Sequence, residues 1–559
     1  MKRGLKLLFL SIISGLIFWL SWAPVGFPFL IFFAWIPLLF ISESLQKSET
    51  KFPFWQGFIY SYPAFIIWNG LTTWWIYYST FEGAIAANVL NAMLMSVVFA
   101  FWHCFRSFKP SKVMSFLLFI SFWCSFEYLH LNWEITWPWL NLGNVFALSS
   151  QYVQWYEYTG TFGGTIWIFL VNILLFELIL KFTAFQNDRK ENKKGSTLIK
   201  KELIILSIST LSVLLIPIII SISIYANYKI KQENGIEAVI VQQNTDPWEE
   251  QYYMTNVDHT KRIIQTAKSQ LSKNTELLVC SESAIPHNIS ATELVDLSYP
   301  VQTYEYYGFI LLDSLIMKNP QLNVIVGLST SIRYDFKKTP TTRNPKAGLF
   351  YDSFNTSICY NRNKVNGMYH KSRLVPGVEK MPYPKVFKFL EYLVIDLGGT
   401  SGSLGIDSTQ RAFQTTINHG KIKIGAPICY ESIYGELFGN FVKDGAQIMS
   451  VITNDAWWQD SPGHKQHFLF SKLRAIETRR YILRAANTGI SAFIDPLGEA
   501  SQETDYGTRT AIKEIVYPND EITFYVKHGD YLARFALAVT VLSTLLGTAF
   551  WIRKKFKHS

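Results

Sequence analysis

Long runs of apolar residues fill the first 225 positions of the chain and return once near its end. The runs cover about residues 7–22, 27–41, 54–78, 84–105, 112–129, 164–182, 203–225 and 530–552. Helices built from such runs can cross a hydrocarbon layer of about 30 Å. The pattern predicts a helical membrane domain of eight transmembrane helices. Seven of them lie in residues 1–228, and the eighth lies with a basic tail in residues 528–559.

A different pattern occupies residues 229–527, where short apolar strands alternate with longer amphipathic segments. The predicted strands cover about residues 237–243, 275–280, 323–329, 354–360, 421–429 and 446–453. The predicted helices cover about residues 251–271 and 464–486. This alternation is typical of an α/β layer fold, and it leaves parallel and mixed strand pairing both open.

Basic residues mark one side of the predicted membrane domain. Lys and Arg cluster after the second, fourth and sixth apolar runs and at the end of the chain, whereas the loops after the first, third and fifth runs contain none. The positive-inside rule places such basic loops in the cytoplasm. We therefore expect a multi-pass protein of the bacterial inner membrane, with both termini in the cytoplasm and residues 229–527 in the periplasm.

Composition agrees with a membrane protein that carries a large soluble domain, because 49% of the residues are hydrophobic and 17% are charged. The net charge of +10 does not indicate a nucleic-acid partner, since the basic residues lie beside the apolar runs. The five cysteines lack metal-ligand spacing, and the sequence contains no HExxH, P-loop or dinucleotide-binding motif. We expect neither a metal nor a cofactor.

One predicted strand, residues 421–429, ends in a cysteine that is a candidate nucleophile. Cys429 follows small and apolar residues and precedes Tyr430 and Glu431. A thiol at a strand end lies at the rim of a sheet, where a substrate can reach it and a main-chain N–H can stabilise an oxyanion. The alternative is a buried structural cysteine, since free cysteines are among the most buried residues.

Three charged residues complete a chemically sufficient set with this thiol. Glu282 follows the strand at about residues 275–280, Lys371 precedes an apolar turn, and Glu379 stands eight residues after Lys371. A glutamate can act as general base for the thiol and later for an incoming amine. A lysine can stabilise both a thiolate and a tetrahedral oxyanion.

The motifs around these residues resemble those of the nitrilase (carbon–nitrogen hydrolase) superfamily. Glu282 in SESAIP, Lys371 in YHKSRLVP and Cys429 in ICYES look like its Glu–Lys–Cys triad. Its later motifs are similar to residues 453–458, 474–477 and 484–489. The resemblance implies an α-β-β-α sandwich for residues 229–527.

The arrangement of the whole chain also resembles a known family. Seven transmembrane helices before a nitrilase-like domain and one after it is the layout of the apolipoprotein N-acyltransferases. The outer loop carries Pro138-Trp139-Leu140 followed by Gly143, which is similar to that family as well. The match extends over nearly the whole chain.

The resemblance implies a reaction and a role for each residue. In the implied scheme, Cys429 attacks an acyl ester of a membrane phospholipid, and the thioester passes its acyl chain to the N-terminal amine of diacylglyceryl-cysteine in a lipoprotein. Glu282 is the base, and Lys371 stabilises the oxyanion together with the Tyr430 main-chain N–H. Three residues match supporting positions of the family: Glu379, Tyr430 and Glu431. We expect a monomer that acts on two lipid substrates.

Three further residues are candidates for substrate binding. Trp248 matches a family tryptophan near the acyl site, with packing in the core as the alternative. Trp139 lies in an outer loop whose aromatic residues are mostly expected to form an interfacial belt. Glu127, near the outer end of the fifth apolar run, is predicted to contact a substrate or the soluble domain, with a carboxylate that snorkels to the interface as the alternative.

Some features depart from the family pattern or have no match in it. The apolar segment 386–394 is hypothesised to be a lid or arm that enters the membrane interface, with a core helix as the alternative. The lysine motif continues with Gly377 and Val378 where the family usually has Phe and Gly. His130 stands where the family often has an arginine, so we expect the headgroup contact there to differ.

Two other functions remain open from the sequence. A membrane-tethered amidase would share the triad, use water in place of the amine and show no dependence on phospholipid. A transporter or scaffold with a degenerate domain would be expected to lack a triad residue, and all three are present.

Overall fold

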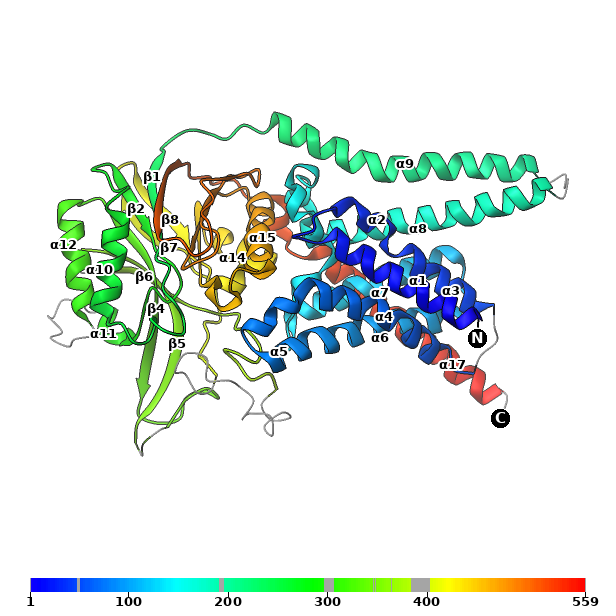
Figure 1. The fold of residues 1–559 in the computed structure, drawn as a ribbon, viewed down its shortest axis with the longest axis horizontal. Coiled ribbons are helices and arrows are strands. Elements are labelled where there is room, and N and C mark those ends of the chain that lie inside the picture. Colours follow the sequence, from blue (N-terminus) through cyan, green and yellow to red (C-terminus); the bar gives the residue numbers. More distant parts are fainter. Residues whose placement is uncertain are drawn as a thin grey trace.

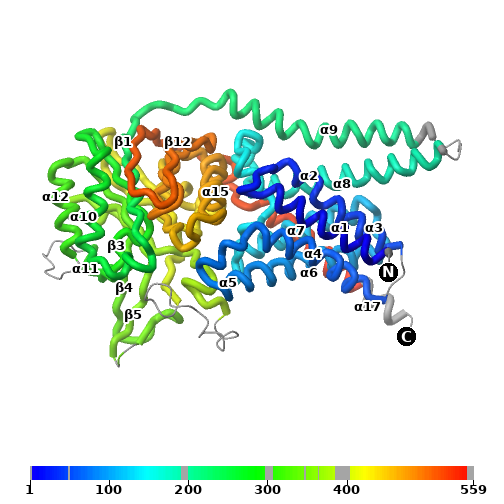
Figure 2. Tube along the Cα trace, viewed as in Figure 1, coloured from blue at the N-terminus to red at the C-terminus, as the bar shows by residue number. Residues whose placement is uncertain are grey.

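The computed structural model describes residues 2–47, 51–190, 196–295, 306–344, 346, 348–362, 364–383 and 403–557. A helix bundle and an α/β domain lie end to end along its long axis (Figure 1). Helix α1 (Lys2–Ser21) begins, and helix α17 (Tyr531–Lys557) ends, at the end of the bundle that lies farthest from the α/β domain. The chain trace in Figure 2 shows α17 returning from the α/β domain into the bundle.

Helices of the bundle follow the apolar runs of the sequence. Besides α1 and α17, its α-helices are α2 (Ile31–Ala34), α3 (Ile36–Gln46), α4 (Pro53–Thr73), α5 (Phe81–Ile85), α6 (Asn91–Arg106), α7 (Lys112–Asn132), α8 (Tyr156–Lys190) and α9 (Ser196–Asn227). Short helical turns connect them: η1 (Pro28–Leu30), η2 (Trp74–Tyr78), η3 (Ala86–Leu90), η4 (Pro138–Leu140) and η5 (Leu142–Tyr152).

Among the described residues, seven helical segments are long and apolar enough to cross a membrane. They are Arg3–Ser21, Pro28–Gln46, Phe81–Arg106, Lys112–Asn132, Tyr156–Arg189, Ile199–Asn227 and Tyr531–Ala549. The remaining predicted span is helix α4, which packs against α1 and α6 but is less apolar. The predicted helical membrane domain is therefore confirmed.

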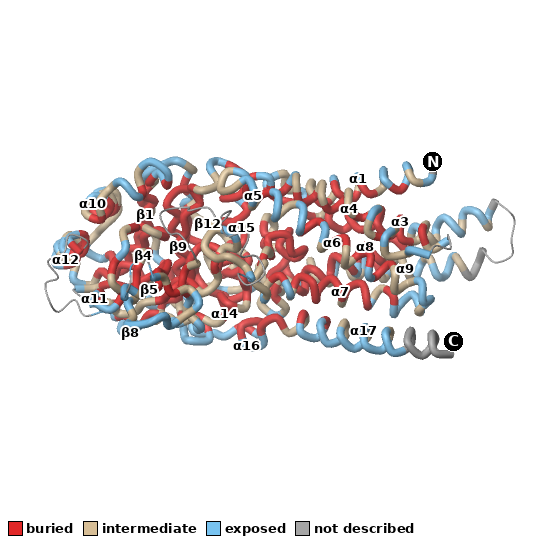
Figure 3. Tube along the Cα trace, turned by 90° about the horizontal axis from the view of Figure 1, so that it is seen from below, coloured by how far each residue is buried: buried red, intermediate tan, exposed pale blue. Residues whose placement is uncertain are grey.

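The outer surface of the bundle is apolar where a bilayer would surround it. Helices α9 and α17 expose much of their surface, as the pale blue segments of Figure 3 show for α17. Exposed side chains on them include Ile204, Ile208, Leu211, Leu542 and Leu545. Leucine and isoleucine on an outward helix face are the residues that lipid tails solvate well.

Two mixed sheets form the α/β domain. The first has the strand order β13-β1-β2-β4-β5-β6, with β3 paired to β4, and the second has the order β12-β11-β10-β9-β8-β7. The first sheet contains β1 (Ile236–Gln242), β2 (Thr275–Val279), β3 (Ile285–Ser290), β4 (Asn323–Tyr334), β5 (Phe350–Asn361), β6 (Lys364–His370) and β13 (Thr510–Val516). The second contains β7 (Phe413–Ile417), β8 (Gly420–Gly425), β9 (Ile448–Thr453), β10 (Ile482–Ala486), β11 (Ala492–Ile494) and β12 (Ala500–Ser501).

Alternate residues of β1 face different layers, since side chains of a strand alternate between its two sides. Ala238 and Ile240 belong to the core that the first sheet shares with strands β7 to β9 of the second. Val239 and Val241 pack instead with the helices α10 (Asn256–Ala267) and α12 (Tyr307–Lys318). The implied α-β-β-α sandwich is therefore confirmed.

Helices on the other side of the sandwich face the membrane domain. Figure 1 shows α14 (Gly435–Lys443) and α15 (Pro462–Thr478) between the second sheet and the bundle. The short helices α11 (Ala291–Val295) and α16 (Phe524–His528) also belong to the described part of the domain. Strand β8 ends at Gly425, before Cys429, so the predicted strand 421–429 is shorter than expected, and α14 and α15 follow β8 and β9 in the chain.

One predicted helix was wrong in extent. The segment 464–486 is not a single helix, because α15 ends at Thr478 and residues 482–486 form strand β10, parallel to β9. Arg479 adopts a left-handed conformation with φ of 51° and terminates the helix. A short, fully buried strand has no polar face, so its hydrophobic pattern cannot be told from that of a buried helix.

The helix predicted over residues 251–271 is shorter in the structure and forms α10 (Asn256–Ala267). The Thr255 side chain accepts a hydrogen bond from the Asp258 main-chain N–H and so caps the N-terminus. Residues before this cap form turns that lie beside the site described below.

Candidate active site

Three strand ends bring the predicted triad to the junction of the two sheets. Glu282 follows β2, Lys371 follows β6, and Cys429 follows β8. The first two strands belong to the first sheet and the third to the second. The structure places the two charged residues in direct contact and the thiol within their electrostatic reach.

Lys371 lies between two carboxylates. Its Nζ is 3.1 Å from Glu282 Oε1 and 2.8 Å from Glu379 Oε1. Asn355 of β5 donates from Nδ2 to the same two carboxylates, at 2.6 and 3.3 Å. These four residues, which we call the front cluster, place one positive charge against two negative charges in a site that leaves the lysine side chain only 1% exposed.

The charge of Lys371 is held by its partners. Burial by itself lowers the pKa of this lysine, but Glu282 and Glu379 outweigh burial and raise the pKa well above its usual value. The ammonium group is therefore present throughout the physiological pH range. A fixed positive charge in a dry site is well suited to stabilise a developing oxyanion.

Main-chain donors orient the two glutamates. The second oxygen of Glu282, Oε2, accepts from the Asn454 N–H at 2.9 Å. Glu379 Oε2 accepts from the Val375 N–H at 2.9 Å. Each carboxylate thus directs one oxygen at Lys371 and ties the other to the backbone, so the front cluster is rigid before substrate binds.

Cys429 begins the short helical turn η8 (Cys429–Ile433) and has a φ of 50°. This left-handed conformation is uncommon outside glycine and marks a strained backbone, a feature that concentrates at functional sites. Residues 428–432, which we call the elbow, therefore turn the chain sharply at the nucleophile. The cysteine is 8% exposed.

The thiol is protonated at rest. Burial and then the charge of Glu282 raise the pKa of Cys429 far above that of an ordinary cysteine, although Lys371 opposes the shift. A protonated thiol is a poor nucleophile, so attack requires a base that removes the proton as the bond forms. Glu282 is the carboxylate whose charge acts most strongly on this thiol.

Glu431 joins the elbow to the lysine strand. Its Oε1 accepts from the Ser372 N–H at 2.7 Å and from the Tyr369 hydroxyl at 2.5 Å. Its Oε2 accepts from the Ile428 N–H at 2.8 Å. Since Ser372 follows Lys371 directly, this buried carboxylate fixes the distance between the lysine and the nucleophile.

Tyr430 joins the elbow to the membrane domain. Its hydroxyl donates to the main-chain carbonyl of Thr136, in the loop after α7, at 2.9 Å. The hydroxyls of Tyr434 and Thr136 are also hydrogen-bonded. The loop of the membrane domain therefore supports the residues that immediately follow the nucleophile.

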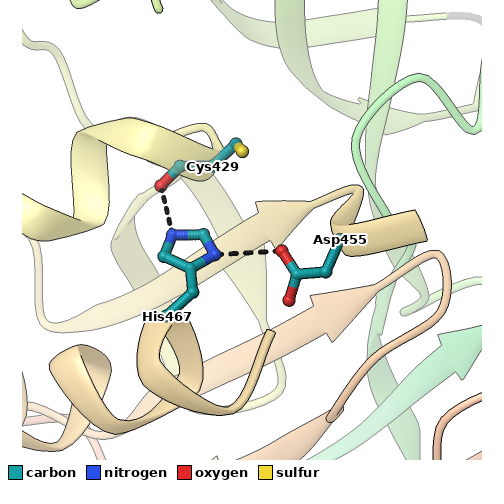
Figure 4. A group of neighbouring side chains, drawn as sticks. All are labelled: Cys429, Asp455 and His467. Atoms are coloured by element: carbon teal, nitrogen blue, oxygen red, sulfur yellow. Dashed lines mark hydrogen bonds and ion pairs between the residues drawn. The ribbon is translucent and has the colours of Figure 1, made fainter. Parts of the chain in front are cut away.

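A second buried group lies behind the elbow, and sequence motifs did not single it out as a functional unit (Figure 4). His467 of α15 bonds through Nε2 to the Cys429 carbonyl at 3.1 Å and through Nδ1 to Asp455 Oδ1 at 2.9 Å. Arg484 of β10 donates to Asp455 Oδ2 at 2.7 Å. We call Asp455, His467 and Arg484 the rear cluster.

The rear cluster is closed to solvent and electrostatically matched. Its three side chains are 0% exposed. Burial by itself raises the pKa of Asp455, but Arg484 and His467 outweigh burial and hold the pKa well below its usual range. Asp455 and Arg484 lie in residues 453–458 and 484–489, which resemble family motifs, whereas His467 lies outside them.

Cys429, Asp455 and His467 are also a group of possible metal ligands within the described part of the chain, with donor atoms within 4.8 Å of one another. Both ring nitrogens of His467 already bond to protein atoms, namely the Cys429 carbonyl and Asp455. The donors fit a hydrogen-bond network, in which the ring has no lone pair directed at the thiol, better than a metal centre.

Trp248 lies at the edge of the site. Its side chain is 49% exposed and contacts Trp457 edge to face, with ring centroids 5.0 Å apart. The alternative of core packing is wrong, because half of the side chain is accessible. Contact with substrate stays a prediction.

Trp139 lies inside the junction between the two domains. It is 1% exposed, stacks on Trp137 and donates from Nε1 to Gln466 Oε1 at 2.7 Å. Its neighbours Trp75 and Trp458 complete an aromatic cluster. Trp139 thus joins α15 to the bundle instead of forming an interfacial belt, and its contact with substrate stays a prediction.

Glu127 is buried within the bundle. Its carboxylate accepts from Trp123 Nε1, from the Leu142 N–H at 2.7 Å and from the Thr165 hydroxyl at 2.8 Å. The snorkelling alternative is wrong, because the residue is 2% exposed and its donors are protein groups. Its predicted contact with substrate or with the soluble domain stays a prediction.

Two further predictions concern the apolar segment 386–394 and His130. The predicted lid segment 386–394 lies outside the described residues. His130 is 3% exposed and packs against Phe126 and Trp133, so its side chain is buried and does not reach the surface of the molecule.

Known proteins match both domains. Residues 238–518 match the carbon–nitrogen hydrolase family, and residues 14–174 match the apolipoprotein N-acyltransferase N-terminal domain. The apolipoprotein N-acyltransferase of Chlorobaculum tepidum is 26% identical over 98% of this chain and 97% of its own length. That of Thermotoga maritima is 23% identical over 97% of this chain and 94% of its own length. Among solved structures, a carbon–nitrogen hydrolase from Helicobacter pylori is 15% identical and covers 50% of this chain and 88% of its own, with a TM-score of 0.32.

Proposed function

The chain belongs to the carbon–nitrogen hydrolase family and, within it, to the apolipoprotein N-acyltransferases, and on this premise we propose how its residues carry out acyl transfer. The enzyme transfers an acyl chain from a membrane phospholipid, through a cysteine thioester, to the N-terminal amine of diacylglyceryl-cysteine in a lipoprotein. The observation that carries the residue assignment is Lys371, which lies between Glu282 and Glu379 within electrostatic reach of the buried thiol.

The first half-reaction forms the thioester. Glu282 removes the proton of Cys429 as the sulfur attacks the ester carbonyl of the phospholipid. Lys371 Nζ and the Tyr430 main-chain N–H stabilise the resulting oxyanion. The tetrahedral intermediate collapses, the lysophospholipid oxygen leaves, and it takes the proton that Glu282 holds.

The second half-reaction uses the same groups in turn. The α-amine of the lipoprotein attacks the thioester carbonyl, and Glu282 accepts a proton from the amine. Collapse of the second intermediate forms the amide and expels the sulfur of Cys429, which recovers its proton from Glu282. Glu379 and Asn355 hold Lys371 and Glu282 in place through both steps, and Glu431 holds the elbow.

The two lipid substrates explain the membrane domain. The protein is an integral membrane protein, and we infer that it lies in the bacterial inner membrane with its α/β domain in the periplasm and both termini in the cytoplasm. Trp248, exposed beside Trp457, is the proposed contact for an acyl chain. Trp139 and Glu127 support the site indirectly, through the domain junction and the bundle.

Mass spectrometry of the purified protein after incubation with phospholipid tests this proposal. We expect an added acyl mass on the Cys429 peptide that hydroxylamine removes and that a diacylglyceryl peptide amine discharges. Cys429→Ala is the control and should show no adduct. Hydrolysis of small amides without any acyl adduct would instead support the alternative of a membrane-tethered amidase.

A further inference from the structure

The main-chain carbonyl of Cys429 is bound from behind by two side chains. His467 Nε2 lies 3.1 Å from this oxygen, and the Ser432 hydroxyl donates to it at 2.8 Å. A carbonyl oxygen can only accept hydrogen bonds, and Arg484, which can only donate, lies 3.1 Å from Nδ1, so the two contacts together assign the ring proton to Nε2. Both donors are fully buried.

The imidazole of His467 is held in one orientation. Its Nδ1 accepts from Arg484 at 3.1 Å and lies 2.9 Å from Asp455 Oδ1, an oxygen that accepts from the Thr453 hydroxyl at 2.8 Å. The other oxygen of Asp455 accepts from Arg484 at 2.7 Å. The ring therefore has no rotational freedom, and the donor it presents to the elbow is fixed.

His467 does not act on the thiol itself. Figure 4 shows the sulfur of Cys429 directed away from the ring, while the carbonyl of the same residue faces Nε2. Both ring nitrogens are engaged, Nε2 with the carbonyl and Nδ1 with Arg484, beside Asp455. The arrangement differs from a cysteine–histidine pair, in which the ring takes the thiol proton.

The bound carbonyl and the proposed oxyanion donor belong to one peptide group. The peptide group that links the two residues consists of the Cys429 carbonyl, whose oxygen faces His467, and the Tyr430 N–H. Hydrogen bonds in a low-dielectric interior polarise one another, so a donor at the oxygen strengthens the N–H as a donor. Fixing the oxygen also fixes the direction of that N–H.

We propose that His467 is a positioning residue, which orients and polarises the Cys429–Tyr430 peptide group so that the Tyr430 N–H binds the oxyanion of each half-reaction. The proposal rests on the proposed function, in which this N–H is an oxyanion donor. It assigns to the rear cluster a role in transition-state stabilisation, separate from the proton transfer carried out by the front cluster.

The helix that carries His467 is also fixed from outside the domain. The preceding residue, Gln466, donates from Nε2 to the carbonyls of Ala23 and Thr72 at 2.7 and 3.1 Å. Its Oε1 accepts from Trp75 Nε1 and Trp139 Nε1. Every hydrogen-bonding position of this amide is used by the membrane domain, so docking of the two domains sets where His467 stands.

Two reactions of the same thiol separate a positioning role from a general structural one. Acylation by phospholipid passes through an oxyanion, whereas alkylation by iodoacetamide does not form one at a carbonyl carbon. Both need the thiol in place and deprotonated. The ratio of the acylation rate to the alkylation rate therefore separates a loss of oxyanion stabilisation from a loss of the position or reactivity of the thiol.

The experiment measures both rates in single-turnover reactions of the full-length protein in detergent, by mass spectrometry of the Cys429 peptide. The variants are His467→Leu, which removes the donor, and His467→Gln, whose amide can replace it. His464→Gln is the matched control, since His464 lies one turn earlier on α15, is equally buried and bonds to Asp460 instead of the elbow.

We expect His467→Leu to lower the ratio by about 10- to 100-fold, less than the loss of a whole oxyanion-hole donor. His467→Gln should keep the ratio within about fivefold of wild type, and His464→Gln should leave it unchanged. If His467→Leu does not fold, Ser432→Ala replaces it, because this variant removes the other donor to the same carbonyl, and the ratio should fall by about threefold or more.

An unchanged ratio in the variant that lacks the donor would overturn the inference. Such a ratio results when both rates stay at the wild-type value and also when acylation and alkylation fall equally. Failure of the proposed function has a different signature. In that case the wild-type protein itself forms no thioester, whereas failure of this inference leaves wild-type thioester formation intact.

Discussion

The front and rear clusters flank the same cysteine and differ in accessibility and charge. In the front cluster the side chains of Glu282 and Glu379 are 7% and 15% exposed, and two carboxylates share one lysine. In the rear cluster Asp455, His467 and Arg484 are 0% exposed, and one carboxylate faces one arginine. The front cluster is therefore partly open to solvent, and the rear cluster is closed to it.

This difference separates proton transfer from preorganisation. Glu282, which accepts and returns a proton, must face the reacting atoms. The second carboxylate of the front cluster, Glu379, helps to keep Lys371 charged. A group that only holds a dipole in place works best when it is matched in charge and shielded from water. Each prediction below tests one side of this division.

The largest expected effect comes from Glu282→Gln. The thiol is protonated at rest, so loss of the base should lower the acylation rate by about 10³- to 10⁴-fold. The measurement is thioester formation on Cys429 in a single turnover. A loss of less than tenfold would mean that another group takes the proton, and the front cluster would then have no special role.

Lys371→Met should have the next largest effect, on both stability and activity. The variant leaves two carboxylates facing each other in a nearly closed site. Removal of one partner of a buried ion pair lowers the free energy of unfolding by about 3–5 kcal/mol. Thermal unfolding in detergent should show a lower Tm. The double variant Lys371→Met with Glu379→Gln should recover part of the stability and none of the activity, since the oxyanion clamp is still missing.

Asp455→Asn tests the rear cluster. The variant keeps the shape but removes the charge that faces Arg484, and we expect a loss of about 2 kcal/mol. The native pKa of Asp455 is lowered, so its stabilising contribution is present above the usual aspartate pKa of about 4 and is lost as the pH falls below that value. Acid unfolding curves of wild type and variant should therefore converge at low pH, and parallel curves would contradict the assignment.

The mildest test changes only the pH and follows the alkylation of Cys429 in the wild-type protein. Because the pKa of Cys429 is raised, the rate with iodoacetamide should rise about tenfold per pH unit from pH 7 to 9.5 without a plateau. A free thiol such as glutathione levels off near its own pKa and serves as the reference. A plateau near pH 8 for Cys429 would mean that Lys371 outweighs burial at the thiol.

The front cluster could be predicted from the sequence because its residues stand in recognisable motifs at strand ends. Glu282 follows an apolar run that ends abruptly, Lys371 precedes an apolar turn, and the resemblance to a family implied their roles and that of Glu379. Asn355 was missed, since an asparagine in a polar-rich strand carries no distinguishing pattern.

The rear cluster could not be assembled from the sequence. His467 lies on a helix and Arg484 on a strand that the hydrophobic pattern merged into one helix over residues 464–486. Their contact depends on the left-handed turn at Arg479, which carries no sequence signal such as glycine. The hydrophobic pattern predicts the membrane helices well, because their length alone is diagnostic. It does not predict the contacts between the two domains, because partners such as Gln466 and Trp75 are 391 residues apart.

The most direct test of the account is the mass of an acceptor peptide. Purified protein would be incubated with phospholipid and a peptide that begins with diacylglyceryl-cysteine. The account predicts a gain of one acyl chain on the α-amine with wild type, no gain with Cys429→Ala, and no gain when the α-amine is acetylated beforehand. An unchanged acceptor mass under conditions in which the wild-type protein hydrolyses small amides would contradict it.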